Sequence, residues 1–373
     1  MKKRILHLIT QLPIGGAEHL LASIVRHLDA DRYESLVCCI QERGELAAMI
    51  EAGGVPVICL ERRGKRFSFG TVLALARLMR EQRIDLVHCH LYHANLYGRL
   101  AARLVGIPAI ATVHNTYVRR KWHRSLLNRW LGRGRGLVIA VSAEARRDVI
   151  EHDRLNPGRV LLLPNGIDLS RVDTQLSQAA AKERLGYAAD DFLIGCIGRL
   201  EEQKGHANII HALGLMLETA SEDLRRRLRL LIIGDGRLRG ELERVAAATG
   251  VSDEVRFAGS RSDVAEILRS LDLYVMPSLW EGLSLAMLEA MAAGLPVIIS
   301  DVGGAAEVLG DGEFGIRVPP GDVAALASAV MVLVQEEAER RRLGAAAQRR
   351  VREHYDLRER VARLEAVYET LLK

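Results

Sequence analysis

The sequence lacks the features that would place the protein in a membrane or outside the cell. No apolar run approaches the ~20 residues that a membrane span needs. The apolar run after the basic start MKKR ends by Gln11, which is too short for a secretion signal. The five cysteines show no C-x-x-C spacing, and most lie in strand-like apolar runs, at Cys38, Cys39, Cys59, Cys89 and Cys196. We therefore expect a cytoplasmic protein with reduced thiols.

The dinucleotide-binding pattern G-x-G-x-x-G is also missing from the first strand–turn–helix segment. The turn there carries only Gly15 and Gly16, between an apolar strand and a helix that starts near Ala17. A glycine-rich turn of this kind can bring backbone N–H groups to a phosphate, although two glycines often serve only the turn. The missing pattern argues against NAD or FAD as a cofactor.

Charge is distributed unevenly along the 373 residues. The net charge is +5, which divides into +11 for residues 1–170 and −6 for the remainder. A basic first half fits an anionic lipid or a lipid phosphate as partner. The acidic second half argues against nucleic acid. With 49% hydrophobic residues, the chain is long enough for roughly two domains, each with its own core.

Short apolar runs alternate with helical segments, which is typical of doubly wound parallel sheets. The alternation runs from Arg4–Thr10 to Arg159–Leu163 and ends with the sequence PNGID at 164–168. Residues 169–190 are polar and rich in alanine and glutamine, and they are interpreted as a linker. The alternation restarts at Phe192. The sequence thus predicts an α/β protein with Rossmann-like domains at 1–168 and from 191 onward.

Residues 272–300 carry the densest chemical information. They predict a strand (Leu273–Met276), a turn, an acidic loop at Glu281-Gly282, a helix from about Ser284, and a second strand. Glu281 and Glu289 are the two acids inside this apolar stretch after its first residue. A helix N-terminus can bind phosphate and carboxylates can accept sugar hydroxyls, so a phosphorylated, polyhydroxylated ligand fits. Alternatively, Glu281 is an ordinary loop acid and Glu289 lies on the polar face of its helix.

Two cations follow the first strand of the second half, namely Arg199 and Lys204. At the carboxyl edge of a parallel sheet they can neutralise a diphosphate, Arg199 through two oxygens and Lys204 as a point charge. As a bare pair they are also compatible with solvated loop residues. Their shared edge with Glu281 favours the ligand interpretation.

Four histidines lie near the ends of strands in the first half. His114 ends the fifth strand, where either a structural or a catalytic role is possible. His88, His90 and His93 could suggest a metal, but no carboxylate or cysteine pair completes a ligand set. Alternation along a strand places His88 and His90 on one face, which packing alone can explain. We expect no metal site.

The basic segment 118–136 contains Trp122, Trp130 and several leucines among its lysines and arginines. This composition is typical of a helix at a membrane surface. A solvated helix that docks by its apolar face is an equally good interpretation.

Short motifs that are specific only in combination occur along nearly the whole chain: GGAE at 15–18, TVHN at 112–115, VS at 141–142, PNGID at 164–168, GRL at 198–200, KG at 204–205, V-x-F-x-G at 255–259, PS at 277–278, EG at 281–282, EA at 289–290 and G-x-PV at 294–297. With these motifs together, the sequence resembles the retaining GT-B glycosyltransferases of family 4, also called glycosyl transferases group 1.

The resemblance implies a role for each matching residue. Arg199 and Lys204 would hold the donor diphosphate and stabilise the leaving group without a metal ion, and Glu281 would lie beside the transferred sugar. His114 would be catalytic from the first domain, near the reacting sugar. Donor binding would also involve Gly16, Gly198, Ala258, Ser260, Arg261, Gly282, Leu283, Ser284, Leu285 and Glu289, the last through the ribose. Acceptor binding would involve Gly15, Gly16 and His114.

The resemblance also implies a fold and an activity. The donor domain would span 191–352, and a C-terminal helix within 353–373 would cross back to the first domain. The enzyme would be a hexosyltransferase that needs no cofactor and transfers a sugar with retention, from a UDP-sugar rather than GDP-mannose. The acceptor would be a glycan or a lipid-linked acceptor in bacterial cell-surface polysaccharide or glycolipid synthesis, at the inner face of the membrane. A nucleotide-sugar epimerase on the same fold and a non-catalytic sugar-binding subunit of a polysaccharide assembly complex remain alternatives.

Overall fold

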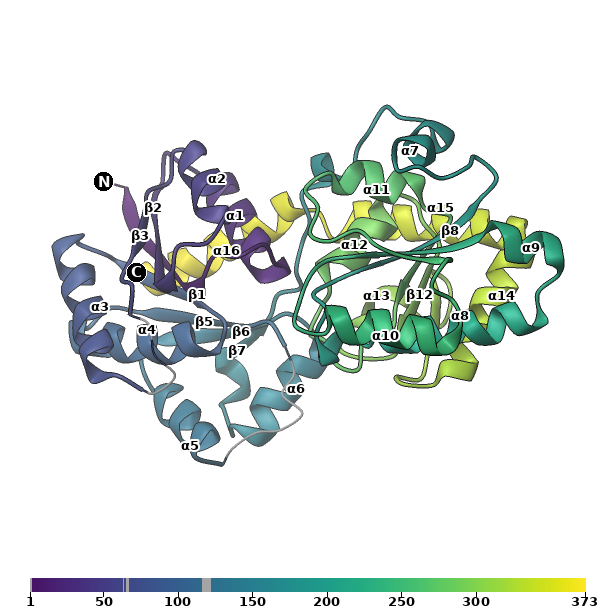
Figure 1. Cartoon of the computed structure of the whole chain (residues 1–373). Helices are drawn as coiled ribbons and strands as arrows, with labels where there is room; N and C mark the ends of the chain where they lie inside the picture. The colour runs from purple at the N-terminus through teal and green to yellow at the C-terminus, as the bar shows by residue number, and fades with distance from the viewer. Residues whose placement is uncertain (1, 63, 65–66, 116–121) are drawn as a thin grey trace. The chain divides into compact units, whose positions relative to one another are not determined.

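The computed structural model describes residues 2–62, 64, 67–115 and 122–373, of which 122–124 are described by their backbone alone. The chain forms two compact units (Figure 1). The first unit comprises Met1–Gly166 together with Leu357–Lys373, and the second comprises Ile167–Asp356. Both units are α/β, which confirms the predicted fold class.

The first unit is built on a sheet whose described strands all pair in parallel, in the order β3-β2-β1-β4-β5-β6-β7. Its central strand β1 has a nearly continuous buried apolar run, as expected of a strand that is covered on both faces. The strands are β1 (Lys3–Gln11), β2 (Tyr33–Glu42), β3 (Val57–Cys59), β4 (Leu86–His90), β5 (Ala109–Val113), β6 (Gly136–Ala140) and β7 (Val160–Leu162).

Helices cover both faces of this sheet. Leu6 and Leu8 of β1 pack with the helices α3 and α4, while Ile9 packs with α1 and α2. The helical segments are α1 (Gly16–His27), α2 (Leu46–Ala52), α3 (Phe69–Glu81), α4 (Tyr92–Val105), α5 (Trp122–Leu131), α6 (Ala143–His152), the 3₁₀ turn η1 (Pro157–Arg159) and α16 (Leu357–Leu372).

The last helix, α16, belongs to the first unit although it is made last. Figure 1 shows it in yellow beside α1, and the two helices pack together. Glu365 accepts a hydrogen bond from the backbone N–H of Asp29 at 2.8 Å. The ring of Tyr368 is fully buried and lies edge-on to Tyr33 at 5.7 Å. The predicted crossing of the C-terminal helix to the first domain is therefore confirmed.

The second unit has a sheet of its own, again with parallel pairing throughout the described strands, in the order β10-β9-β8-β11-β12-β13. The central strands β8, β9 and β11 are buried almost along their whole length. The strands are β8 (Phe192–Ile197), β9 (Leu228–Ile233), β10 (Val255–Phe257), β11 (Leu273–Met276), β12 (Val297–Ser300) and β13 (Ile316–Val318).

The helices of the second unit include α8 and α14, which pack against each other and onto the sheet through a large apolar cluster. The helical segments are η2 (Leu169–Arg171), α7 (Gln178–Arg184), η3 (Glu202–Lys204), α8 (His206–Thr219), α9 (Glu222–Arg227), α10 (Arg239–Thr249), α11 (Val264–Ser270), α12 (Leu285–Ala292), α13 (Ala305–Leu309), α14 (Val323–Gln335) and α15 (Glu337–His354).

Residues 169–190 differ from the predicted linker. They are part of the second unit and contain α7, which packs on α11. The ammonium of Lys182 lies 2.8 Å from a carboxylate oxygen of Asp272, and Gln178 donates a hydrogen bond to the carbonyl of Leu271 at 2.7 Å. The alanine and glutamine content that suggested a linker is also good helix composition. The division between the units lies at Gly166 and Leu357.

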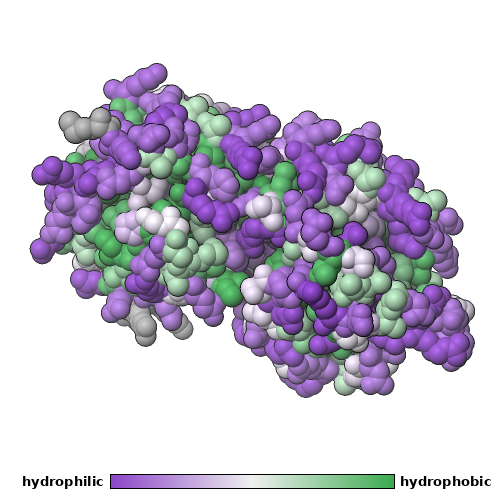
Figure 2. All heavy atoms as spheres, turned by 90° about the horizontal axis from the view of Figure 1, so that it is seen from above, coloured by the Kyte–Doolittle hydropathy of each residue, from purple (hydrophilic) through white to green (hydrophobic). Residues whose placement is uncertain are grey.

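In the described part of the chain no helix is both long and apolar enough to cross a bilayer. Figure 2 shows a face on which hydrophilic side chains dominate and apolar ones occur in small groups. Of the basic segment 118–136, residues 118–121 lie outside the described residues. Residues Trp122–Leu131 form α5, on which Leu126 and Trp130 are exposed and Leu131 is buried, and a loop leads from there to Gly136 at the start of β6.

Candidate active site

The predicted donor residues of the second unit lie in loops that leave the carboxyl edge of one sheet. β8 and β11 are neighbours, so the loop after β8 and the loop after β11 emerge side by side. The first loop carries Arg199 and Lys204, and the second carries Ser278 and Glu281. This edge is where open α/β sheets bind ligands.

Lys204 and Glu281 form an ion pair at this edge, with 2.5 Å between the ammonium and Oε1. The side chain of Glu281 is 8% exposed and that of Lys204 is 20% exposed. Ser278 donates to the same Oε1 at 2.9 Å. Gln203 donates to Oε2 at 3.4 Å and to the carbonyl of Trp280 at 2.9 Å. The carboxylate is thus held in one orientation by three side chains, since each of these bonds restrains it.

Gly205 explains why the two loops can approach so closely. Its φ is +61°, and a Cβ on it would lie 2.1 Å from the carbonyl oxygen of Pro277. The backbone N–H of Leu279 donates to the carbonyl of Gln203 at 2.8 Å across the same junction. A side chain at Gly205 would push the loops apart and separate Lys204 from Glu281.

Gly282 to Leu285 lead directly into the N-terminus of α12. The Ser284 hydroxyl accepts a hydrogen bond from the N–H of Met287 at 3.4 Å and caps the helix. The carbonyl of Gly282 accepts from the N–H of Gly304 at 2.6 Å, which ties this loop to the turn after β12. Leu283 is 7% exposed. The segment therefore has a fixed backbone at the end of a helix that favours anions.

Glu289 lies on α12 and is largely buried. Burial raises the pKa of its carboxyl, and the positive charge of Arg171 opposes this rise. Arg171 Nη2 lies 3.8 Å from Oε1 of Glu289. The polar-face alternative for Glu289 does not fit, because the side chain is only 13% exposed.

Arg199 is exposed beside an open pocket of about 320 Å³. A Cβ on the preceding Gly198 would lie 3.2 Å from Cδ of Lys204, so this glycine leaves room for the lysine stem. The cavity brings Arg199 and Lys204 together with Trp280, which directly precedes Glu281. Its lining is Arg199, Glu201, Glu202, Gln203, Lys204, Arg237 and Trp280. Two cations within one pocket can neutralise a diphosphate.

Ala258, Ser260 and Arg261 follow β10 at the far end of the same edge. The N–H of Ala258 donates to the carbonyl of Ile232, which extends the sheet pairing by one residue. Arg261 is paired with Asp263 through Nε at 2.8 Å. The structure thus places these residues at the carboxyl edge, and their predicted role toward the base stays a prediction.

His114 follows β5 at the carboxyl edge of the first unit's sheet. Its Nε2 lies 3.3 Å from Nδ1 of His90, and the two rings stack at 5.6 Å. Burial lowers the pKa of His114 to about 3, with a further contribution from the charge of Arg360. Within the described residues Nε2 of His90 is buried without a partner. Of Nδ1 of His90 and Nε2 of His114, one donates to the other, and the tautomers of the two rings decide which one does so.

Gly15 and Gly16 lie at the start of α1, which begins at Gly16. A Cβ on Gly15 would lie 2.4 Å from Oε2 of Glu18, the end of a flexible side chain. Glu18 is buried in the first turn of this helix. The loop is therefore compact, and its predicted roles toward donor and acceptor are untested.

The histidine cluster at the centre of this sheet has a different membership from the predicted one. His7, His88 and His90 offer ligand atoms within 4.8 Å of one another, because β1 and β4 pair His7 with His88. Both nitrogens of His88 are engaged, with the Tyr368 hydroxyl and the Thr112 hydroxyl at 2.7 Å each. A dication here would also lie near the Arg360 guanidinium, whose charge lowers the pKa of His88 and His90. These observations disfavour a metal.

Several residues of the two edges could not be identified from the sequence. Gln203 precedes Lys204, and Ser278 stands three residues before Glu281. These polar side chains close to two predicted site residues are the sequence feature that could have indicated them. Arg171, His7 and Arg360 gave no local signal, because each meets its partner only through tertiary packing.

Two family models match nearly all of the chain. The model described as Glycosyltransferase Family 4 matches residues 14–171, and the one described as Glycosyl transferases group 1 matches residues 177–350.

Individual relatives agree with these models, and a solved structure has the same fold. The chain is 31% identical over 321 residues to the glycosyltransferase EpsF of Bacillus subtilis, covering 80% of this chain and 79% of that protein. It is 27% identical over 316 residues to the UDP-Gal:alpha-D-GlcNAc-diphosphoundecaprenol alpha-1,3-galactosyltransferase of Escherichia coli, covering 81% and 80%. The crystal structure of Anabaena Alr3699/HepE in complex with UDP and glucose shares the fold, with a TM-score of 0.87, 22% identity and coverage of 98% and 99%.

Proposed function

Since the chain belongs to the family 4 glycosyltransferases of the GT-B fold, we propose that it transfers a sugar from a nucleotide-sugar donor to a glycan or lipid-linked acceptor, with retention and without a metal ion. The observation that carries the proposal is the ion pair of Lys204 and Glu281, fixed by Ser278 beside the N-terminus of α12. Cell-surface polysaccharide or glycolipid synthesis, at the inner face of the membrane, is the proposed setting.

A UDP-sugar is the proposed donor, in preference to GDP-mannose. The support comes from similar proteins, since the Escherichia coli relative is named for UDP-Gal and the Anabaena structure holds UDP and glucose. The lipid-linked acceptor is supported in the same way, by the diphosphoundecaprenol in the name of that relative.

The second unit supplies the electrostatics of the reaction. Lys204 and Arg199 would neutralise the diphosphate as the bond from the anomeric carbon to the phosphate oxygen breaks. Lys204 has two further N–H donors beyond the bond to Glu281, and these are free to reach phosphate oxygens. Glu281 is held by Lys204 and Ser278, so it is better suited to orient sugar hydroxyls than to take a proton.

The proton balance of the transfer then closes within the substrates. The acceptor oxygen bonds to the anomeric carbon on the face that the diphosphate leaves, and the acceptor proton passes to the departing phosphate oxygen. His114 remains neutral because burial lowers its pKa to about 3. In the tautomer with its proton on Nδ1, the neutral His114 ring would accept from His90 through Nε2 and donate to a substrate hydroxyl through Nδ1.

Nucleotide release tests the proposal directly. The purified protein is supplied with a panel of UDP-, GDP- and other nucleotide sugars, with and without lipid-linked and free glycans, in the presence of a chelator. We expect acceptor-dependent release from a UDP-sugar and loss of this release in Lys204→Ala and Glu281→Ala. Unchanged turnover in both variants, or no response to any donor, would sink the proposal. Proton NMR of the first product formed reports the anomeric configuration.

A further inference from the structure

A second cavity lies in the first unit at the edge of the sheet opposite His114. It has a volume of about 350 Å³ and is formed where β5, β6 and β7 begin and where α4 and α5 end. His114 follows the carboxyl end of β5, whereas the cavity includes Ala109 at its amino end. The cavity therefore takes no part in the proposed site.

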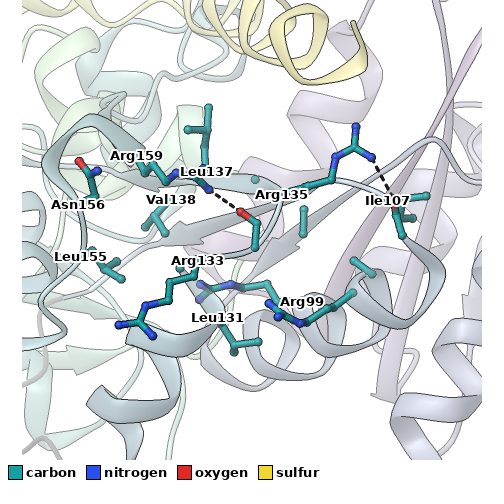
Figure 3. A pocket seen from close by; sticks show the side chains of 17 residues that line it. Arg99, Ile107, Leu131, Arg133, Arg135, Leu137, Val138, Leu155, Asn156 and Arg159 are labelled. Carbon is teal, nitrogen blue, oxygen red and sulfur yellow. Dashed lines mark hydrogen bonds between the residues drawn. The ribbon is translucent and has the colours of Figure 1, made fainter.

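Arginine dominates the polar lining of this cavity. Figure 3 labels four of these arginines around the cavity, Arg99, Arg133, Arg135 and Arg159. The lining has five in all, from three segments of the chain: Arg99 and Arg103 of α4, Arg133 and Arg135 of the loop after α5, and Arg159 of η1. No acidic residue is among the described residues that line it. Burial lowers the pKa of Arg99 to about 10, and Cys89 and Asp153 oppose this decrease. Arg99 thus stays charged at neutral pH.

Capping of helix ends explains only part of this arrangement. Arg135 donates to the carbonyl of Gly106 at 3.4 Å, and Arg159 donates to that of Gly134. Arg99 reaches the carbonyl of Asn128 at 3.5 Å. Gly106 caps α4 and Asn128 lies in the last turn of α5, and carbonyls at helix C-termini favour cations. Each of these bonds uses one of the five N–H donors of a guanidinium, so most donors remain for an anion.

Exposed apolar side chains flank the arginines. Leu104 at the end of α4 is 48% exposed, and Leu126 and Trp130 on α5 are 55% and 43% exposed. The spacing of Leu126 and Trp130 places them on one face of α5. The guanidinium of Arg103 lies over the Trp130 ring at 4.4 Å, which links this face to the cavity. Arginines beside exposed leucine and tryptophan are typical of surfaces that sit in the headgroup region of a bilayer.

We propose that this cavity binds the phosphate of an anionic phospholipid headgroup, while Trp130, Leu126 and Leu104 enter the boundary between headgroups and acyl chains. Charge complementarity selects the occupant, because the lining offers arginines and no carboxylate. The proposal rests on the proposed function in one respect only, the location of a lipid-linked acceptor at a membrane.

Vesicle flotation of the full chain tests the proposal. The wild type is compared on vesicles of phosphatidylcholine alone and of phosphatidylcholine mixed with phosphatidylglycerol. We expect binding only to the mixed vesicles, and a loss of about 30-fold in Arg99→Gln/Arg133→Gln, since each arginine near an anionic surface contributes about fivefold. The matched control is Arg226→Gln/Arg341→Gln, which removes the same charge from side chains of the second unit that are 66% and 80% exposed. It should change binding less than threefold.

Two further variants separate a phosphate pocket from diffuse attraction. Arg133→Lys keeps the charge but loses the planar fork that grips two phosphate oxygens, so it should weaken vesicle binding by about threefold or more. Trp130→Ala should weaken binding to mixed vesicles. Trp130→Phe should keep this binding, because phenylalanine retains an apolar aromatic ring at this position. Equal binding of Arg133→Lys and wild type would overturn the pocket.

Two solution measurements complete the test. Titration with glycerol 3-phosphate should show weak binding that Arg99→Gln/Arg133→Gln abolishes. If this soluble phosphate binds but the variant still floats with mixed vesicles, the cavity is not the lipid site. Nucleotide release with a soluble acceptor should be equal in the variant and the wild type, which shows that the variant is folded. If the wild type releases no nucleotide with any soluble acceptor, this result counts against the proposed function and not against the lipid site.

Discussion

Acid should destabilise the first unit more than the second. The reason is the group of buried histidines around His7, His88, His90 and His114, whose pKa values are all lowered, chiefly by burial. In the unfolded chain each would have a pKa of about 6.5. Between that value and about pH 3 the unfolded state binds more protons than the folded state, so the unfolding free energy falls as the pH falls.

The size of the effect follows from the pKa values of His7 and His114, both lowered to about 3. At about pH 5 an unfolded histidine is almost fully protonated, and each buried neutral histidine then costs about 2 kcal/mol. His7 and His114 together give about 4 kcal/mol, a large share of a typical 5–15 kcal/mol. His88 and His90 add in the same direction. The second unit has His206, with a pKa lowered to about 4, and so loses about 2 kcal/mol.

Hydrogen–deuterium exchange measures each unit separately. The opening free energy is obtained from peptides of β1 and β4 and from peptides of β8 and β9, at about pH 7.5 and about pH 5, after correction for intrinsic exchange rates. The first unit should lose at least about 2 kcal/mol more than the second. His7→Phe should remove about 2 kcal/mol of this loss, because phenylalanine cannot be protonated in the unfolded chain. The substitution breaks no side-chain hydrogen bond of the ring, since neither ring nitrogen of His7 has a partner among the described residues. His354→Gln, at an exposed position, is the control.

Two results would refute the reasoning. A parallel loss in both units would mean that buried histidines do not set the acid response. An unchanged loss in His7→Phe, with the variant as stable as the wild type at about pH 7.5, would mean that His7 is protonated in the folded state.

Four further predictions concern the candidate active site. Lys204→Ala should lower kcat of nucleotide release by about 10²–10³, as loss of charge stabilisation on a leaving group does; a drop below tenfold in steady-state assays would contradict this. Gly205→Ala should lower the unfolding free energy of the second unit by more than Gly250→Ala does, as measured by urea unfolding. Both glycines have a positive φ, but only at Gly205 would the new Cβ lie 2.1 Å from a carbonyl oxygen, that of Pro277. The pH–rate profile should have no acidic limb near 6.5 from His114, whose pKa is about 3, and a His114-dependent limb there would contradict its neutral role. Arg171→Ala should raise the pKa of Glu289 further, because the charge of Arg171 opposes the effect of burial. In initial-rate assays KM for the donor should therefore rise more steeply in this variant than in the wild type as the pH falls.

The elements of the fold could be predicted because parallel strands covered on both faces appear as short apolar runs. The strand Leu273–Met276 and the helix that begins after Ser284 follow this pattern, and the structure has β11 and α12 there. The grouping of Arg199, Lys204 and Glu281 was predictable as well, because carboxyl ends of neighbouring parallel strands meet at one edge.

Other features depend on register and packing and leave no local trace. His7 meets His88 only because β1 and β4 pair at that register, and Arg171 reaches Glu289 from a segment that follows the first unit. The segment 169–190 was predicted as a linker because its polar composition suits both a linker and the exposed helix α7. Whether an acidic loop residue binds a ligand or a lysine cannot be decided from spacing, and the pairing of Glu281 with Lys204 emerges only from the close approach at Gly205.

The placement of α16 in the first unit has a consequence for biosynthesis. The hydroxyl that bonds Nδ1 of His88 belongs to Tyr368, which is made after the whole second unit. While the chain is being synthesised, the second unit can complete its core before the first unit has received its last helix. The contacts of Tyr33 and His88 with Tyr368 can therefore form only after the final residues of the chain have been synthesised. A chaperone that protects the nascent protein would be needed longest at the amino-terminal sheet, which is synthesised first.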